Sequence, residues 1–119
     1  MKKFSKSVQY ALQGIRYALL GSNFRIMVLM GCIAILFGAV LNISDLSWMI
    51  VVALIAVNLS FEMFNSCIEM ICDFISPHHD TRIGRIKDMA AGAVLIIALA
   101  SLVISAFIFI PKISQLCIH

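Results

Sequence analysis

The stretch Glu62-Met-Phe-Asn-Ser-Cys-Ile-Glu-Met-Ile-Cys-Asp73 decides the fold, because it continues a long apolar run and yet carries three carboxylates and an amide. On a helix with about 100° per residue, the side chains of Glu62, Asn65, Glu69 and Asp73 fall within an arc of about 80°. Since carboxylates at membrane depth are costly, four polar groups on one face indicate a functional site. The alternative interpretation is a transmembrane helix that emerges into water here, with its acids solvated or paired with Lys and Arg.

The composition is that of a membrane protein. Of the 119 residues, 62% are hydrophobic and only 13% are charged. A soluble domain of this length would be far more polar, and the length allows one domain, residues 1–119. The sequence has no GxxxxGKS/T loop and no GxSxG motif, so it supports neither a P-loop nucleotide site nor the nucleophile of an α/β-hydrolase. Nothing in it indicates a nucleic-acid partner.

The apolar runs predict an all-α integral membrane fold with three transmembrane helices, at residues 23–41, 46–74 and 86–110. The short polar connection at 42–45 favours an antiparallel hairpin between the first two helices. The second helix is longer than about 30 Å of hydrocarbon requires. We therefore expect Glu69 and Asp73 to lie near the membrane interface, with Glu62 deeper.

The remaining segments lie outside these spans. The N-terminal segment through Arg25 holds five basic residues and no acid, with apolar residues at helical spacing, which predicts an amphipathic surface helix at residues 1–22. Its basic side chains suit an anionic membrane face and could also reach a phosphorylated ligand. We expect residues 76–85 to form a loop, and Pro111 to end the third span.

The basic residues also set the orientation. They gather in the N-terminal segment and in the loop at 76–88, whereas the connection at 42–45 has none. The positive-inside rule therefore places the N-terminus of this multi-pass protein in the cytoplasm. The polar ends of the second and third spans then face the compartment in which nucleotides are found.

Cysteines and histidines give weaker signals. The four cysteines form no CxxC pair, and we interpret them as buried, reduced thiols that pack as small hydrophobes: Cys32, Cys67, Cys72 and Cys117. The sequence His78-His79-Asp80 could hold a metal, but three adjacent ligands in one loop are a weak pattern. Contact of this loop with a bound nucleotide is the favoured interpretation.

The polar residues at this interface suit phosphoryl transfer. That reaction needs a carboxylate to hold Mg²⁺, positive charge on the phosphates and a base for the attacking hydroxyl. The acids of 62–73, the Lys87-Asp88 pair and the basic N-terminal helix supply such groups, and a membrane-embedded alcohol fits their location. Composition alone equally allows an ion pathway, since acids in a helix bundle also serve transport.

The polar motifs resemble those of a known family. The pattern Glu62-x-x-Asn65-Ser66-x-Ile68-Glu69-x-x-x-Asp73, followed by Gly84-Arg85-x-Lys87-Asp88-Met89-Ala90-Ala91-Gly92-Ala93-Val94-Leu95, closely resembles the prokaryotic diacylglycerol kinase family, which includes undecaprenol kinases. The likeness covers nearly the whole chain, including Tyr10, Gly14 and residues 23–26. It implies a lipid kinase of the bacterial inner membrane, assembled as a homotrimer with active sites between subunits near the cytoplasmic interface.

The resemblance also implies a role for individual residues. Glu62 would be the general base for the lipid hydroxyl, and Glu69 would hold the Mg²⁺ that is bound to ATP. Asn65 and Asp73 would orient the site. The residues that would contact or support the nucleotide are Lys87, Asp88, Tyr10, Lys3, Lys6, His78, His79 and Asp80.

Two departures from the family pattern bear on activity. Gly21 stands where the family usually has a glutamate that helps to bind the metal, and Met27 stands where one branch often has histidine. Another group such as Asp80 could replace that glutamate, or the chain could be a weakly active or non-catalytic lipid-binding member. Residues 23–26 and 90–93 look more like the undecaprenol kinases, so undecaprenol is favoured over diacylglycerol as the acceptor.

Overall fold

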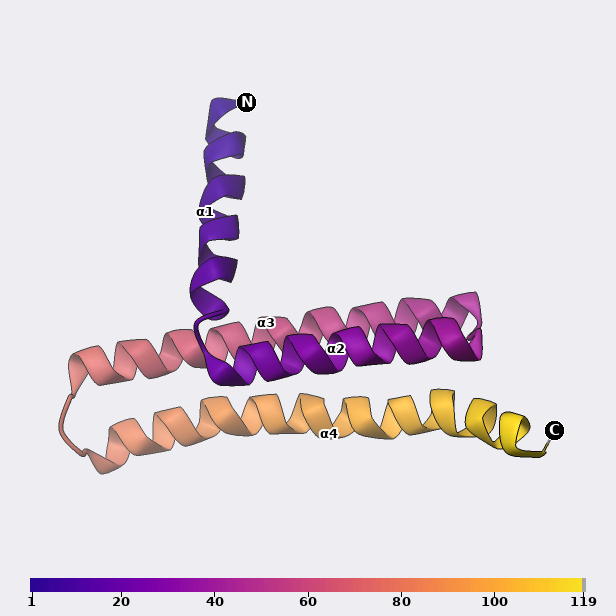
Figure 1. The fold of residues 1–119 in the computed structure, drawn as a ribbon. Coiled ribbons are helices and arrows are strands. Elements are labelled where there is room, and N and C mark those ends of the chain that lie inside the picture. The colour runs from indigo at the N-terminus through magenta and orange to yellow at the C-terminus, as the bar shows by residue number, and fades with distance from the viewer. Residues whose placement is uncertain (119) are drawn as a thin grey trace.

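Four helices make up the part of the chain that the computed structural model describes, residues 1–118 (Figure 1). They are α1 (Lys2–Ala18), α2 (Ser22–Leu41), α3 (Asp45–Ile75) and α4 (Thr81–Ile118). α2, α3 and α4 run side by side with alternating direction, while α1 leaves the bundle at a steep angle. α2, α3 and α4 are each long and apolar enough to cross a membrane, which confirms the expected all-helical architecture with three long apolar helices.

Glycines let α2 and α3 pack closely. A Cβ atom added at Gly38 would lie 2.8 Å from Cη2 of Trp48, and one added at Gly31 would lie 3.2 Å from Cγ2 of Ile55. Both positions therefore favour glycine. Small residues are common wherever helices approach closely in membranes. The two contacts are seven residues apart on each helix, which fixes the antiparallel register of the hairpin.

The turn of this hairpin satisfies its own polar groups. Asn42 ends α2 in the left-handed region, at φ 53°, a conformation that asparagine tolerates better than most residues. The next amide, that of Ile43, donates to the carbonyl of Gly38 at 3.2 Å. Ser44 then caps α3, because its hydroxyl accepts a hydrogen bond from the amide of Ser47 at 3.2 Å.

α3 is longer than the membrane is thick. Its 31 residues span about 46 Å at about 1.5 Å per residue, against about 30 Å of hydrocarbon. If the helix enters the hydrocarbon near Asp45, about 20 residues bring it to the neighbourhood of Asn65. On that placement, which stays a prediction, the last turns with Glu69 and Asp73 would project into the interface and water.

α4 differs from the sequence-based prediction at both ends. It begins at Thr81 rather than at 86, because the Asp80 carboxylate accepts a hydrogen bond from the backbone amide of Arg82 at 2.8 Å and so caps the helix. The expected loop is thereby shortened to residues 76–80. The expectation that Pro111 ends the span is wrong, since the helix continues to Ile118. Proline removes one backbone donor, a loss that membrane helices tolerate.

Few side chains are buried within the single chain. In residues 1–118 the buried apolar residues are Phe24, Ile43, Val51 and Cys72, while large apolar side chains are exposed along every helix. An apolar surface of this extent indicates contact with lipid or with other protein chains. All four cysteines are free thiols, as expected, but only Cys72 is buried.

Candidate active site

The polar stripe of α3 divides into a buried half and an exposed half. Glu62 is 5% exposed and Asn65 is 7% exposed, and they are the buried polar residues in the part of the chain that the structure describes. Glu69 and Asp73, farther along the same helix, are exposed. The structure thus places the four side chains on one helix as predicted, and it separates them into two environments.

The buried half contains a polar atom without a partner. The amide oxygen Oδ1 of Asn65 is buried and accepts no hydrogen bond from residues 1–118. Leaving such an acceptor unsatisfied costs about 1–3 kcal/mol. A group from outside the described chain that donates a hydrogen bond here would recover that energy, so Asn65 is suited to contact a ligand or a second subunit.

The exposed half is tied to α4 by an ion pair. Nζ of Lys87 donates to Oδ1 of Asp73 at 2.8 Å, with the Lys87 side chain 36% exposed. The antiparallel packing of α3 and α4 therefore brings a cation beside the carboxylates of the stripe. Asp88 follows Lys87 and is exposed, and its side chain makes no hydrogen bond or ion pair with residues 1–118.

The α2–α3 register brings the start of α2 to the stripe. The Gly38–Trp48 and Gly31–Ile55 contacts are seven residues apart on each helix, and one more step of seven sets Phe24 level with Glu62. The same register sets Gly21 level with Asn65. Position 21 is therefore at the depth of the candidate site.

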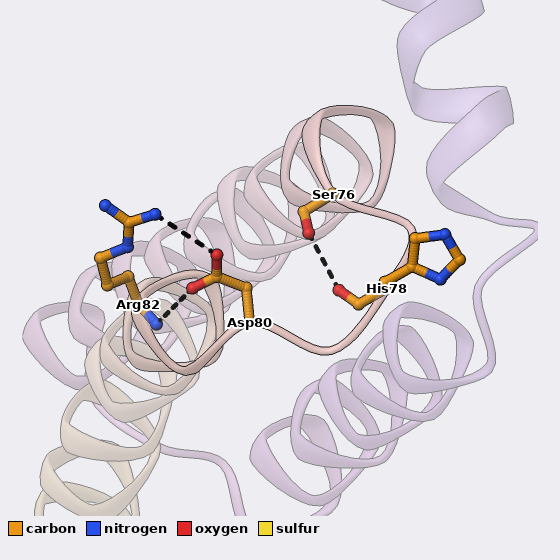
Figure 2. A network of polar contacts seen from close by, with 4 residues as sticks. All are labelled: Ser76, His78, Asp80 and Arg82. Carbon is orange, nitrogen blue, oxygen red and sulfur yellow. Dashed lines mark hydrogen bonds and ion pairs between the residues drawn. The ribbon is translucent and has the colours of Figure 1, made fainter.

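The connection between α3 and α4 is organised by its own contacts (Figure 2). The Ser76 hydroxyl donates to the carbonyl oxygen of His78 at 2.9 Å, and Nη2 of Arg82 lies 3.5 Å from Oδ2 of Asp80. The backbone amide of Arg82, and then its guanidinium, hold the pKa of the Asp80 carboxyl below its usual range. Asp80 thus caps α4 in the described chain.

Metal ligands do not cluster within the single chain. Among residues 1–118 no three His, Cys, Asp or Glu side chains are grouped so that they could hold a metal ion, so the three residues 78–80 form no metal site. Glu69 offers one exposed carboxylate. That set fits Mg²⁺ carried by a nucleotide, because such an ion is bound by one or two carboxylates together with the phosphates and water.

The N-terminal helix does not reach the stripe of its own chain. α1 points away from the bundle (Figure 1), Tyr10 is 73% exposed, and Lys3 and Lys6 are also exposed. In the described part of the chain, no side-chain hydrogen bond or ion pair links α1 to α3 or α4. The three α1 residues predicted to contact a nucleotide are therefore not assembled with Glu62 in one subunit.

The sequence analysis missed Asn58. Its Nδ2 atom donates to the carbonyl of Leu54 and to Oγ of Ser101 on α4, both at 2.7 Å. Asn58 precedes Glu62 by four residues and so lies about 40° from it around the helix, within the arc of the stripe. Extending the helical arc backwards into the apolar run would have found it.

Comparison with known proteins agrees with these motifs. The family model described as prokaryotic diacylglycerol kinase matches residues 9–109. The undecaprenol kinase of Bacillus subtilis (strain 168) is 34% identical over 113 residues, which cover 94% of this chain and 92% of that protein. The diacylglycerol kinase of a Synechocystis species (strain PCC 6803) is 26% identical over 114 residues, covering 94% of this chain and 65% of that protein.

The match and the two relatives cover nearly the whole chain, including the stripe of α3 and the start of α4. Both relatives carry the names of lipid kinases, which confirms the expectation of an enzyme of this class. The chain belongs to the prokaryotic diacylglycerol kinase family.

Proposed function

We propose that the protein transfers the γ-phosphate of ATP to the hydroxyl group of a membrane lipid alcohol, with Mg²⁺, and that undecaprenol is preferred to diacylglycerol. The observation that carries this proposal is the divided stripe of α3. Its buried half, Glu62 and Asn65, is shielded from water and would receive the hydroxyl of a lipid alcohol. Its exposed half, Glu69 and Asp73, would face nucleotide phosphates in water.

Glu62 is the general base in this mechanism. It takes the proton of the lipid hydroxyl, whose oxygen attacks the γ-phosphorus while the bond to the β–γ bridging oxygen breaks and ADP leaves. A positioned general base contributes about 10²–10⁴-fold to such a step. Burial of Glu62 keeps bulk water away from the acceptor and so favours transfer to the alcohol over hydrolysis.

The surrounding residues bind and orient. The unpartnered Oδ1 of Asn65 accepts a hydrogen bond within the assembled site. Lys87, which Asp73 holds at 2.8 Å, offers its charge to the phosphates, and Asp88 supports the nucleotide. Glu69 would hold Mg²⁺, which, when bound, neutralises phosphate charge. The residues 78–80 lie at the cytoplasmic end, near the nucleotide.

The complete site is proposed to form between subunits of a homotrimer. The exposed apolar faces of α2, α3 and α4 leave room for contacts between copies. α1 points away from its own bundle, so Tyr10, Lys3 and Lys6 would approach a nucleotide only as part of such an assembly. In this arrangement α1 lies on the cytoplasmic surface of the bacterial inner membrane, with its basic side chains toward anionic lipid.

The preference for undecaprenol rests on similarity. The Bacillus relative has the higher identity of the two and is covered over 92% of its length, whereas the Synechocystis relative is covered over 65%. Undecaprenol has one hydroxyl and an entirely apolar tail, and the cavity among α2, α3 and α4 has an almost entirely apolar lining.

A second candidate function follows from Gly21. If the missing glutamate is essential, the chain is a lipid-binding or assembly protein that keeps the fold without full metal ligation. A glutamate is sterically possible here, because a Cβ at Gly21 would meet only the carbonyl oxygen of Ala18, at 3.4 Å, and φ is −80°.

The deciding experiment measures ATP-dependent phosphorylation of undecaprenol and of diacylglycerol in mixed micelles, for the wild type and for Gly21→Glu, over a Mg²⁺ titration. Wild-type activity, higher on undecaprenol, is the expected result, and Gly21→Glu should lower the Mg²⁺ concentration needed for half-maximal rate. Activity only in Gly21→Glu would support the non-catalytic alternative. Absence of phosphorylation of either lipid by the wild type and by Gly21→Glu would contradict the proposal.

A further inference from the structure

Two side-chain hydrogen bonds join α3 to α4 in the part of the chain that the structure describes. Lys87 binds Asp73 near the cytoplasmic end, and Asn58 binds Ser101 deeper in the bundle. Along α3, Glu62 and Asn65 lie between these two contacts. Glu62 and Asn65, which are proposed to contact the lipid alcohol, therefore lie between the two side-chain hydrogen bonds that join α3 to α4.

The deeper contact is anchored at both ends to the helix backbone. Nδ2 of Asn58 donates to Oγ of Ser101 and also to the carbonyl of Leu54 on its own helix, both at 2.7 Å. The Ser101 hydroxyl in turn donates to the carbonyl of Ile97 on α4 at 2.7 Å. Because each side chain is tied to its own backbone, the hydrogen bond between them couples the two helices rather than two mobile side chains.

The partners also fix the orientation of the Asn58 amide. A carbonyl oxygen can only accept, and the hydrogen of the Ser101 hydroxyl is committed to Ile97, so both partners of Asn58 require an N–H donor. Asn58 and Ser101 line an apolar cavity of about 560 Å³ among α2, α3 and α4, where water does not compete well for these groups. The apolar surroundings therefore favour the hydrogen bond between Asn58 and Ser101.

The Asn58–Ser101 hydrogen bond bears on how far α3 is rotated about its own axis, and so on where the polar stripe points. Side-chain tips lie about 5 Å from a helix axis, so a rotation of α3 by about 10° moves the carboxylate of Glu62 by about 1 Å. A misplacement of about 1 Å costs up to about 10²-fold in rate. Asn58 is one helical turn from Glu62, which is close enough to set its rotation.

We propose that Asn58 and Ser101 are positioning residues for phosphoryl transfer, which hold the rotation of α3 against α4 so that Glu62 stays turned into the site. The inference rests on the proposed function, because it concerns the placement of the proposed base. Neither residue touches the reacting atoms. Both act through the helix that carries Glu62.

The first test is kinetic. Asn58→Leu is similar in size and leaves no unpaired amide at membrane depth, and Ser101→Ala removes only the hydroxyl. We expect kcat to fall by about ten- to a hundredfold in each, with KM for ATP unchanged, because the nucleotide contacts lie elsewhere. The matched control is Ser105→Ala, one turn along α4 in the same cavity and without a hydrogen bond to α3, which should keep the wild-type kcat. The double variant Asn58→Ser, Ser101→Asn exchanges the two partners of the hydrogen bond. Its kcat should be higher than that of Asn58→Leu or of Ser101→Ala.

The second test does not depend on activity. A hydrophobic carbodiimide modifies buried carboxyl groups, and mass spectrometry follows its rate of reaction at Glu62 in the same variants. Asn58→Leu and Ser101→Ala should change this rate several-fold, and Ser105→Ala should not.

The outcomes separate this inference from the proposed function. A wild type that phosphorylates no lipid alcohol removes the proposed function, and the labelling at Glu62 then decides alone whether Asn58 and Ser101 set its placement. In an active wild type, unchanged labelling in both single variants overturns the inference, as does changed labelling with unchanged kcat. Failure of the exchanged pair to exceed the single variants also counts against it, since it would show that the hydrogen bond itself is not what matters.

Discussion

The two ends of α3 treat their polar groups in opposite ways. At the end near Asp45, the Ser44 hydroxyl caps the helix, Asn42 closes the preceding turn, and Gly38 admits the ring of Trp48. At the other end, the Asn65 amide oxygen is buried without a donor from residues 1–118, and Glu69 is exposed. The first end satisfies its polar groups within one chain, whereas the second leaves a buried acceptor free for a partner from outside residues 1–118.

This difference separates stability from function along one helix. Substitutions that disturb the packing at the closed end should lower the stability of the fold while sparing the chemistry of molecules that remain folded. Substitutions at the open end should stop the chemistry while sparing the fold. The three predictions below test that separation, in order of expected effect.

The largest effect is expected for Glu62→Gln. If Glu62 is the general base, as proposed, its loss should lower the rate of phosphate transfer by about 10²–10⁴-fold. Glutamine is nearly isosteric, so the assembly should persist. Initial rates of transfer and size-exclusion chromatography in the same detergent measure the two properties.

The matched control for this variant is Asp45→Asn, at the closed end of the same helix, where an exposed carboxylate occupies the first turn. It should keep nearly wild-type turnover. Near-normal turnover in Glu62→Gln would show that Glu62 is not the base. It would also show that the two ends of α3 do not differ in function as proposed.

A second prediction concerns Gly38→Val at the closed end. Its added atoms would overlap the ring of Trp48 and force the hairpin apart, at a cost of about 1–3 kcal/mol in the free energy of unfolding. Trp48 is the sole tryptophan of the sequence, so its fluorescence during a denaturant titration reports on this contact directly. The kcat per folded molecule should stay close to that of the wild type.

Gly92→Ala is the matched glycine control for stability, because a Cβ at Gly92 meets nothing within 4 Å. Equal unfolding curves for Gly38→Val and the wild type would show that the close packing at Trp48 contributes nothing.

The smallest effect is expected at Asp80, which lies beyond the open end of α3. Its pKa is lower in the folded chain than in the unfolded chain, so its ionised form stabilises the fold above the ordinary value of about 3.9. That contribution is lost as the pH falls through the lower, folded pKa. A ¹³C NMR titration of the Asp80 carboxyl should therefore give a pKa below about 3.9.

Arg82→Gln sharpens this prediction. The backbone amide of Arg82 is the largest single cause of the lowered pKa and its guanidinium comes next, so the variant should still show a pKa of Asp80 below the ordinary value. A return of the Asp80 pKa to the ordinary value in Arg82→Gln would show instead that the side chain dominates, and that the cap of α4 is weak.

Much of the fold was predictable from apolar length and from the spacing of polar residues. The sequence predicts the second span at 46–74, and α3 runs from Asp45 to Ile75. The arc of Glu62, Asn65, Glu69 and Asp73 follows from helical geometry alone. Which of these side chains are buried does not, because burial depends on the neighbouring helices.

The predictions that missed have physical reasons. The sequence interpretation offered Asp80 as a nucleotide contact, which stays a prediction, and did not foresee that its carboxylate accepts a hydrogen bond from the Arg82 amide and caps α4. Asn58 was passed over inside an apolar run, because its partner Ser101 is 43 residues away and the pairing depends on the register of α3 and α4. The contact of α1 with a nucleotide stays a prediction, because within the described chain α1 points away from the bundle that carries the stripe (Figure 1).

The uninterrupted course of α3 has a consequence for where the enzyme can work. Bilayers differ in hydrocarbon thickness by a few Å, and one residue of helix covers about 1.5 Å. Such a difference moves the hydrocarbon boundary by two or three residues along α3, whereas Glu62 and Glu69 are seven residues, or about 10 Å, apart. An uninterrupted helix therefore keeps the proposed base, Glu62, on the hydrocarbon side and the proposed metal ligand, Glu69, on the water side of that boundary over the ordinary range of bilayer thickness, without any adjustment of the backbone.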